Sequence, residues 1–290
     1  MKLTHETLHL TIDGTLAVYK SKELADTYGS PYVFDPEAMD GWDNSPDVKR
    51  DSTERPQAHG DYSSRGLYTS KMVTLTGHVF VTSPEQMQVA RDTFVGALND
   101  GQDHTIAVTK TSGTLYATMQ QGGAVQWLRE TDLHARFLVE LYAADPRMYG
   151  GIRTAQAYSE TRDDHAVKFP LTYPLSFGKP ETVGRAVLSN AGNSPAYPTY
   201  TVNAYLPLGF SITTEGRSIV FGGTTFEGSP VVIDTYAGTA SVSGLDRSYQ
   251  LMKRDWTPIP PRGTLAVEFA PLGGLETAAW ADVTYRDTYT

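Results

Sequence analysis

The sequence predicts a mainly β chain with two β domains, the first of which carries one packed α-helix. Three observations lead to this prediction. Short apolar runs alternate with polar residues at a period of two, which is typical of half-buried strands. Glycine and proline, 26 and 17 residues respectively, separate these runs as turns. The length of 290 residues suits one large or two ordinary domains.

The first half contains a regular series of alternating stretches. Leu8, Leu10 and Ile12 alternate, and Asp13-Gly14 then predicts a tight turn into a return strand. The predicted strands of this half are residues 8–12, 16–19, 73–81, 104–109, 115–119 and 133–141. The segment from Tyr28 to Thr69 lacks any such pattern and is interpreted as a long irregular loop, a feature that is usually functional or mobile.

One helix is predicted over residues 84–98. Ser83 suits the N-cap, Pro84 suits the first helical position, and Gln86 completes a capping box. One face of this helix is apolar and consists of Met87, Ala90, Phe94 and Leu98. We expect this face to pack against the first sheet.

The second half shows about seven short strands with regular turns, which predicts a second sandwich. The predicted strands are residues 185–189, 200–206, 218–221, 231–234, 239–242, 265–269 and 280–285. Hydrophobic periodicity lapses between residues 150 and 168. We therefore expect domains at 1–155 and 156–290.

Composition excludes several classes of function. Lys and Arg total 24, Asp and Glu total 33, and the formal net charge is −9, which disfavours wrapping nucleic acid. The absence of cysteine excludes disulfides, thiolate metal sites and cysteine nucleophiles. No apolar run approaches the roughly 20 residues of a membrane span. We expect neither membrane insertion nor a signal peptide.

Residues His5, Glu6 and His9 match H-E-x-x-H, a zinc-peptidase signature. The signature requires a helix, where residues four apart share one face. On a strand, four residues separate the two histidines by about 13 Å, too far to share one zinc ion. The alternation of Leu8, Leu10 and Ile12 favours a strand, so we interpret the match as a coincidence.

Other candidate chemistry is weak. Asp163, Asp164 and His165 form a carboxylate pair with an imidazole, but three polar neighbours in a linker are more often solvated. The remaining histidines are scattered, and His78 and His134 fall on the minority face of their strands. No nucleophile elbow, P-loop or dinucleotide fingerprint occurs. The sequence thus predicts no enzyme, no catalytic residue, no cofactor and no metal site.

Residues 188–202, LSNAGNSPAYPTYTV, predict a turn that enters a strand. Asn190, Gly192, Asn193 and Pro195 favour a turn with left-handed backbone positions. We interpret the segment as a loop that leads into the strand near Tyr200.

Five stretches, in this order and spacing, resemble the distal tail proteins of long-tailed bacteriophages, especially minor tail proteins of phages that infect actinobacteria. The stretches are residues 55–79 (RPQAHGDYSSRGLYTSKMVTLTGHV), 83–98 (SPEQMQVARDTFVGAL), 143–150 (AADPRMYG), 188–202 and 254–269 (RDWTPIPPRGTLAVEF). Together they span nearly the whole chain.

The resemblance implies an N-terminal ring-forming β-sandwich with a helix, followed by a galectin-like β-sandwich. It further implies a hexameric ring in the virion tail tip, assembled in the host cytoplasm. Such a ring joins the tail tube protein to the tip or hub proteins, lets DNA pass and can carry receptor-binding proteins. By position, 28–69 and 71–81 are the expected subunit contacts. The sugar motif of true galectins is absent, so sugar binding is not implied.

Two alternative functions remain open at this stage. Exposed Trp and Tyr side chains of the second domain suit a carbohydrate- or receptor-binding tail module. The histidine pair near the N-terminus leaves a zinc peptidase as the more remote alternative.

In the expected ring, an acidic channel would let DNA pass without adhering, because like charges repel.

Overall fold

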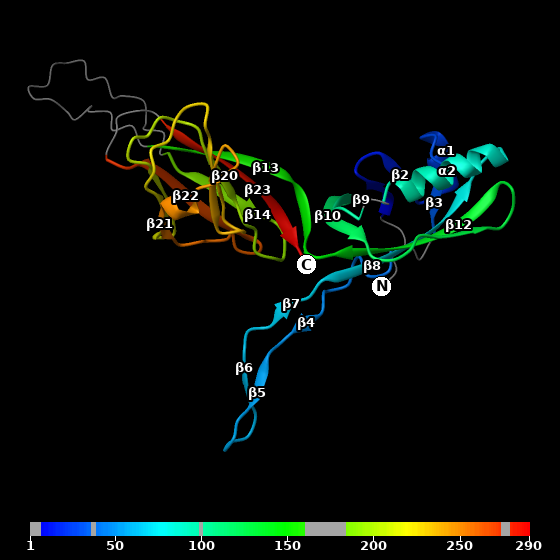
Figure 1. Cartoon of the computed structure of the whole chain (residues 1–290), viewed down its shortest axis with the longest axis horizontal. Helices are drawn as coiled ribbons and strands as arrows, with labels where there is room; N and C mark the ends of the chain where they lie inside the picture. The colour runs from blue at the N-terminus through cyan, green and yellow to red at the C-terminus, as the bar shows by residue number, and fades with distance from the viewer. Residues whose placement is uncertain (1–6, 36–38, 99–100, 160–183, 274–278) are drawn as a thin grey trace, which may run out of the picture. The chain divides into compact units, whose positions relative to one another are not determined.

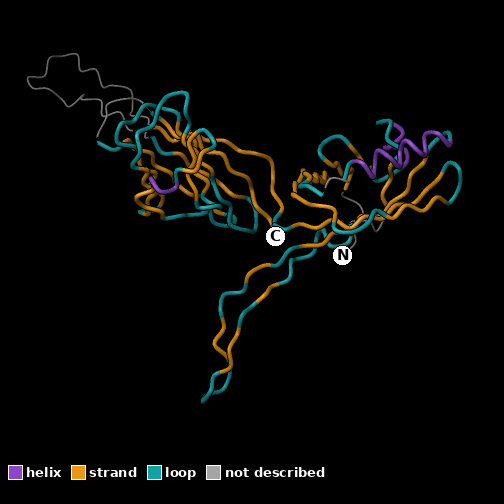
Figure 2. Tube along the Cα trace, viewed as in Figure 1, coloured by secondary structure: helices purple, strands orange, loops and turns teal. Residues whose placement is uncertain are grey.

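The computed structural model describes residues 7–35, 39–98, 101–159, 184–273 and 279–290. The chain divides into two compact units, Met1–Gly151 with Thr290, and Ile152–Tyr289. Strands dominate both units, as Figure 2 shows, so the prediction of a mainly β chain is confirmed.

The first unit is built on one strongly curved sheet with the strand order β11-β12-β8-β3-β2-β1-β9-β10 (Figure 1). Strand β10 also pairs with β12, and this second pairing closes the sheet on itself. The strands are β1 (Thr7–Ile12), β2 (Leu16–Tyr19), β3 (Tyr32–Phe34), β8 (Lys71–Phe80), β9 (His104–Lys110), β10 (Gly113–Gln121), β11 (Gln126–Arg129) and β12 (His134–Ala143). Closure leaves a smaller number of free edges than an open sheet would have.

Strand β8 shows how the sequence pattern becomes a packed sheet. Its odd-numbered residues are buried and its even-numbered residues are exposed or half-buried. Gly77 lies opposite Phe137 of β12, and a Cβ atom there would stand 2.4 Å from the carbonyl oxygen of Val33 and 2.5 Å from the Phe137 ring. Glycine therefore allows β3 and the aromatic ring to approach β8 closely.

Helix α2 (Pro84–Gly96) covers the buried face of this sheet. The Ser83 hydroxyl caps it by accepting from the backbone N–H of Gln86. The Gln86 side chain accepts from the backbone and side chain of Thr82, one residue earlier than a standard capping box. Phe94 packs against Phe137 at 4.5 Å between ring centroids. The predicted apolar face is buried, so this helix is confirmed.

The segment that lacked a pattern is more regular than expected. Helix α1 (Lys22–Thr27), capped by Ser21, precedes it, and strand β3 lies within it. The remainder forms two short ladders, β4 (Val48–Lys49) with β7 (Leu67–Tyr68) and β5 (Ser52–Glu54) with β6 (Asp61–Ser63). The interpretation of an irregular loop was wrong, because elements this short and this exposed carry no hydrophobic period.

The second unit contains two sheets that pack face to face. One has β23 (Trp280–Tyr289) beside β15 (Thr199–Val202), β18 (Val231–Asp234), β19 (Thr239–Val242) and β20 (Leu245–Asp246). The other has the order β14 (Ala186–Asn190), β22 (Gly263–Pro271), β16 (Phe210–Thr214), β17 (Arg217–Phe221) and β21 (Leu251–Arg254). Strand β13 (Met148–Tyr158) crosses the boundary between the units along the chain.

Both sheets of the second unit contribute to one apolar core. Its largest fully buried side chains are Tyr200, Phe210 and Phe221. The seven predicted strands are all present, and their ends differ from the expected ones by at most four residues. Four strands were missed, β13, β16, β20 and β21, together with the short 3-10 helix η1 (Ser248–Gln250).

The segment 188–202 forms the expected loop, but by a different backbone route. Neither Gly192 nor Asn193 adopts a positive φ, so the prediction of left-handed positions was wrong. Gly192 is needed for space, because a Cβ atom there would stand 1.8 Å from the carbonyl oxygen of Thr288. The buried Asn190 accepts from the backbone N–H groups of Gly192 and Thr288 and donates to the carbonyl oxygen of Ser194.

Among the helices in the described ranges, none combines the length and the apolar character that crossing a membrane requires.

Candidate interaction surface

The most distinctive surface of the first unit is an extended β-hairpin, residues 47–69, here called the arm. Figure 1 shows it running out from the body of this unit as the β4–β7 and β5–β6 ladders. At the root of the arm, the backbone N–H of Thr69 donates to the carbonyl oxygen of Asp47 at 2.8 Å and joins its two strands. Arg55 and Gly60 close its tip through a backbone hydrogen bond of 3.2 Å.

Nearly every residue of the arm is exposed, including its large apolar side chains. Tyr62 is 64% exposed, Leu67 56%, Tyr68 52% and Val48 49%. An isolated two-stranded hairpin is at best marginally stable in water. The arm also leaves the outer N–H and C=O groups of its strands without ladder partners among the described residues. Such a hairpin is suited to packing against another chain.

The charges of the arm are balanced and interspersed. Its four acidic residues are Asp47, Asp51, Glu54 and Asp61, and its four basic residues are Lys49, Arg50, Arg55 and Arg65. The Arg55 guanidinium also lies over the Tyr62 ring, 5.0 Å from its centroid. A surface of mixed sign with exposed aromatics matches the composition of protein interfaces better than that of a nucleic-acid groove.

A rigid base supports the arm where it leaves the sheet. Trp42 is fully buried, and Asp40 pairs with Thr74 of β8 through a backbone bridge. Gly41 has φ +91°, and a Cβ atom there would stand 2.3 Å from the carbonyl oxygen of Met72. Lys110 of β9 forms an ion pair with Asp43 at 2.8 Å. These contacts fix the chain on the N-terminal side of the arm.

Lys71 fixes the other side of the base. Its ammonium group donates to the carbonyl oxygen of Trp42 at 2.5 Å, although the residue is only 5% exposed. Burial lowers the pKa of Lys71, and the nearby charge of Asp43 acts in the opposite direction. A buried amine bonded to a carbonyl thus ties the two ends of the arm together.

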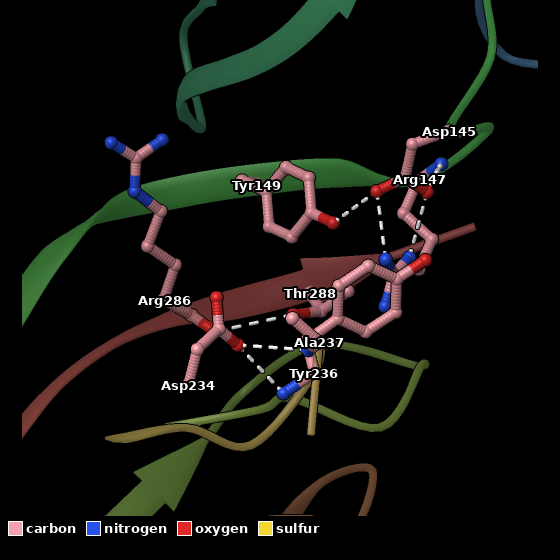
Figure 3. A network of polar contacts seen from close by, with 8 residues as sticks. All are labelled: Asp145, Arg147, Tyr149, Asp234, Tyr236, Ala237, Arg286 and Thr288. Atoms are coloured by element: carbon pink, nitrogen blue, oxygen red, sulfur yellow. Dashed lines mark hydrogen bonds and ion pairs between the residues drawn. The ribbon is translucent and has the colours of Figure 1, made fainter. Parts of the chain in front are cut away.

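A second ordered feature follows β12, at the segment 143–150. Figure 3 shows Asp145 between Arg147 and Tyr149. The carboxylate of Asp145 accepts two hydrogen bonds from the Arg147 guanidinium, at 2.8 and 2.7 Å, and one from the Tyr149 hydroxyl at 2.5 Å. Burial raises the pKa of Asp145, but these hydrogen bonds outweigh it and the net pKa is lowered. This turn has the geometry of a structural clamp.

Figure 3 also contains a turn that belongs to the second unit. Asp234 accepts from the backbone N–H groups of Tyr236 and Ala237, at 2.8 and 3.0 Å. Its side chain therefore replaces a backbone turn contact, which is a common role of aspartate. Neither of these two clusters has the features of a catalytic constellation.

The N-terminal zinc-like match falls partly outside the described residues. His5 and Glu6 lie outside them, whereas His9 lies in β1 and pairs with Tyr19 of β2. The prediction of a strand here is confirmed for residues 7–12. The helix that the zinc signature requires is therefore absent at His9. Asp163, Asp164 and His165 also lie outside the described residues.

The remaining histidines differ in their surroundings. His59 is exposed near the tip of the arm, and His104 contacts the Asp13 carboxylate at 2.7 Å. His78 and His134 lie on adjacent strands and contact each other at 2.9 Å. Sequence reasoning missed this pair, because the register of β8 against β12 was not known. The sequence did indicate that each histidine lies on the less apolar face of its strand.

The predicted subunit contacts can now be located. The segment 28–69 includes the arm, which is accessible along its whole length. Strand β8 is paired along its whole length with β12, and on its other side residues 77–79 pair with β3. Only its half-buried face, which includes Met72 and Thr74, remains accessible.

Comparison with known proteins identifies the fold. No protein-family model matches the chain, and no curated protein matches its sequence. Among solved structures, the SPP1 Dit protein superimposes with a TM-score of 0.63 at 11% identity, covering 97% of this chain and 99% of that one. It is described as a paradigm of the hub adsorption apparatus in phages that infect Gram-positive bacteria.

A second structure is similar at a lower level. A chain of the phage P2 baseplate, in its activated conformation with calcium, has a TM-score of 0.45 at 12% identity, covering 82% of this chain and 86% of that one.

The chain therefore has the fold of a phage distal tail protein over nearly its full length. The resemblance found in the sequence is confirmed at the level of fold. The SPP1 Dit protein is the specific structure that carries this conclusion.

Proposed function

We propose that this protein is a structural distal tail protein of a bacteriophage. In this role it forms a ring, hexameric as the resemblance implies, that joins the tail tube to the tail tip or baseplate and lets DNA pass. The proposal rests on the shared fold, and no group of three or more candidate metal ligands occurs among the residues that the structure describes.

The single observation that carries the ring is the exposed arm. Its large apolar side chains are about half exposed or more, and the outer edges of its strands have no ladder partner among the described residues. A neighbouring copy can supply that partner, and repetition of one heterologous contact around an axis closes a ring. In this assembly, residues 1–155 form the ring and residues 156–290 form a galectin-like sandwich.

The remaining parts of the proposal follow from this role. The partners are the tail tube protein, a tip or hub protein and, on the second domain, receptor-binding proteins. The site of action is the tail tip of the virion, after assembly in the host cytoplasm. DNA is in contact with the ring only in passage, and the acidic charge of the chain favours passage over retention. No enzymatic activity belongs to this role.

Site-directed photo-crosslinking tests the ring directly, because the chain contains no cysteine. A Tyr62→Cys variant labelled with a maleimide benzophenone places the reactive group on the arm. We expect irradiation to give a ladder of covalent multiples of the 31.7 kDa chain. A Val89→Cys variant on α2 is a matched control, since Val89 is 66% exposed but lies away from the arm.

The two variants give opposite expectations. The proposal predicts subunit multiples from the arm label and few or none from the helix label. Equal yields from both positions would indicate random collision. An arm label that gives only single chains at high protein concentration would contradict the role of the arm.

A receptor-binding module is the second candidate function, and one contact in the second unit favours it. Tyr205 and Phe226 are 59% and 56% exposed, and their ring centroids lie 5.9 Å apart. Exposed aromatic rings of this kind offer a stacking surface for a sugar. Binding on a glycan array that is lost in a Tyr205→Ala, Phe226→Ala variant would support this second function.

A further inference from the structure

His78 and His134 form the centre of a row of four side chains in the first unit, Asp35, His78, His134 and Glu130, here called the imidazole chain. The two histidines lie on the adjacent strands β8 and β12. Their inner nitrogens, His78 Nδ1 and His134 Nε2, lie 2.9 Å apart, the length of an ordinary hydrogen bond. At the outer ends, His78 Nε2 lies 2.6 Å from Asp35 Oδ1, and His134 Nδ1 lies 3.0 Å from Glu130 Oε2.

The three contacts of the imidazole chain need three protons, because each hydrogen bond holds one proton between its two atoms. Ionised carboxylates supply none, and each neutral imidazole supplies one, on one of its two nitrogens. Two neutral rings therefore leave one of the three contacts as two facing lone pairs. Two fully protonated rings place two N–H groups opposite each other at the central contact. The chain of three hydrogen bonds thus needs one proton more than two neutral rings carry.

The added proton belongs on the histidine rings and not on a carboxylate. An ordinary imidazole is more basic than an ordinary carboxylate by about two pH units. The Arg136 guanidinium also lies near both ends of the chain, 3.9 Å from Asp35 and 4.0 Å from Glu130. A positive charge beside a carboxylate favours its ionised form. The two rings together then carry one positive charge.

We propose that the imidazole chain is a proton-dependent lock within the first unit. With one added proton, all three contacts are hydrogen bonds and the lock is closed. Loss of this proton, or gain of a second one, removes a hydrogen bond and opens the lock. The four side chains come from the residue after β3, from β8, from β12 and from the residue after β11. Opening therefore loosens the sheet where these four segments meet.

The other charged groups around the rings limit the lock to one added proton. Besides the two carboxylates, the described neighbours are Arg136 and Lys22 of α1, whose ammonium group lies 5.2 Å from the centroid of Phe80. The Phe80 ring in turn stacks on one of the histidines, with 4.8 Å between centroids. Asp132, in the turn after β11, is paired with Arg129. Two cations near the rings oppose a further positive charge.

An amide in place of Asp35 removes the need for the added proton. The Asp35→Asn side chain can donate an N–H to His78 Nε2, so two neutral rings then suffice for three hydrogen bonds. The variant loses one negative charge from the carboxylate and one positive charge from the rings. At about pH 8, where an ordinary imidazole is neutral, we expect its net charge to equal that of the wild type.

Capillary electrophoresis of the folded full-length chain measures this charge. Asp92→Asn, on the exposed surface of α2, is the matched control and should raise the net charge by one, because Asp92 lies outside the imidazole chain. We expect the mobility of Asp35→Asn to change by less than half of the control shift. A change of half the control shift or more would overturn the proposal.

Nitrogen magnetic resonance of the wild type, labelled with isotopic histidine, does not depend on how a variant folds. We expect three protons on the four ring nitrogens of the pair at about pH 8, where an ordinary imidazole carries one proton. A fourth proton should bind only on acidification, and the amide signals of Phe80 and His134 should shift in the same step. His59, in the exposed arm, is the internal control for an ordinary ring.

Two results of this measurement would overturn the proposal. One is a count of two ring protons on the pair at about pH 8. The other is a single step from two to four protons in which both rings titrate together with His59. The lock lies outside the arm, so neither result bears on the proposed ring.

Discussion

The ammonium group of Lys71 donates a 2.5 Å hydrogen bond to the carbonyl oxygen of Trp42, and both residues are buried. Trp42 precedes the arm in the sequence and Lys71 follows it. One contact therefore closes a loop that contains the whole hairpin. The exposed arm is held at its root by the core, although its own length contributes little to that core.

Replacing Lys71 with methionine should weaken this base. The change keeps an apolar side chain of similar length but leaves the buried Trp42 carbonyl oxygen without its charged donor. We expect a loss of about 1.5–3 kcal/mol in the free energy of unfolding. Urea denaturation measures it. Lys49→Met, on the exposed arm, should change the value by less than about 0.5 kcal/mol and serves as the control.

The base also requires glycine at position 41. A Gly41→Ala variant combines an unfavourable φ of +91° with a Cβ atom 2.3 Å from the Met72 carbonyl oxygen. Gly14→Ala has a similar strain, φ +68°, but no atom within 4 Å. We expect Gly14→Ala to cost about 1 kcal/mol and Gly41→Ala clearly more, as measured by thermal unfolding. Equal losses of stability in the two variants would show that the Met72 backbone shifts to accommodate the new Cβ atom without a loss of stability.

Asp145 should make the stability of the first unit depend on acid pH. Burial opposes its charge, but Arg147 and Tyr149 lower its folded-state pKa below the unfolded value, which is about 3.9. Its stabilising contribution is therefore complete above the unfolded pKa and is lost as pH falls through the folded pKa. The stability difference between wild type and Asp145→Asn should be largest near pH 7 and should shrink below about pH 4.

Urea midpoints measured from pH 7 down to pH 3 test this expectation. Asp92→Asn, on the exposed surface of α2, is the control, because the side chain of Asp92 makes exposed polar contacts with its helix neighbours Gln88 and Arg91. A difference that stayed constant over the whole pH range would show that the Asp145 clamp acts by packing and not by charge.

Asn190 should be the polar residue on which the second unit depends most. Its amide accepts from two backbone N–H groups and donates to the Ser194 carbonyl, and the residue is only 2% exposed. Asn190→Ala leaves these buried groups unsatisfied and should cost about 2–4 kcal/mol in unfolding free energy. Asn203→Ala is the exposed control, since Asn203 accepts from one backbone N–H, that of Gly228.

Sequence patterns predicted the elements in which a regular hydrophobic pattern continues over many residues and one face is buried. Strands β8 and β12 alternate over ten residues, and helix α2 has one apolar face. Their buried residues are those that the sequence indicated, except that Leu133, at the predicted start of β12, is exposed. Asp13 and Gly14 both adopt positive φ, as the predicted turn between β1 and β2 requires. These features depend on local chemistry, which the sequence carries directly.

Other features depend on contacts that the sequence does not carry. The arm has no buried face, so no hydrophobic period reveals it. The closeness of His78 and His134 follows from the register of β8 against β12, which is a long-range property. Gly192 was correctly associated with a turn, but it serves close packing against Thr288 and not a left-handed backbone.

Electron microscopy of the purified full-length chain tests the central claim most directly. The account predicts rings with a central hole, built from six copies of the 31.7 kDa chain. A variant in which residues 48–68 are replaced by a short glycine-serine turn should give single chains under the same conditions. Particles of single-chain size at every concentration up to the solubility limit, for the wild type as well as the variant, would contradict the account.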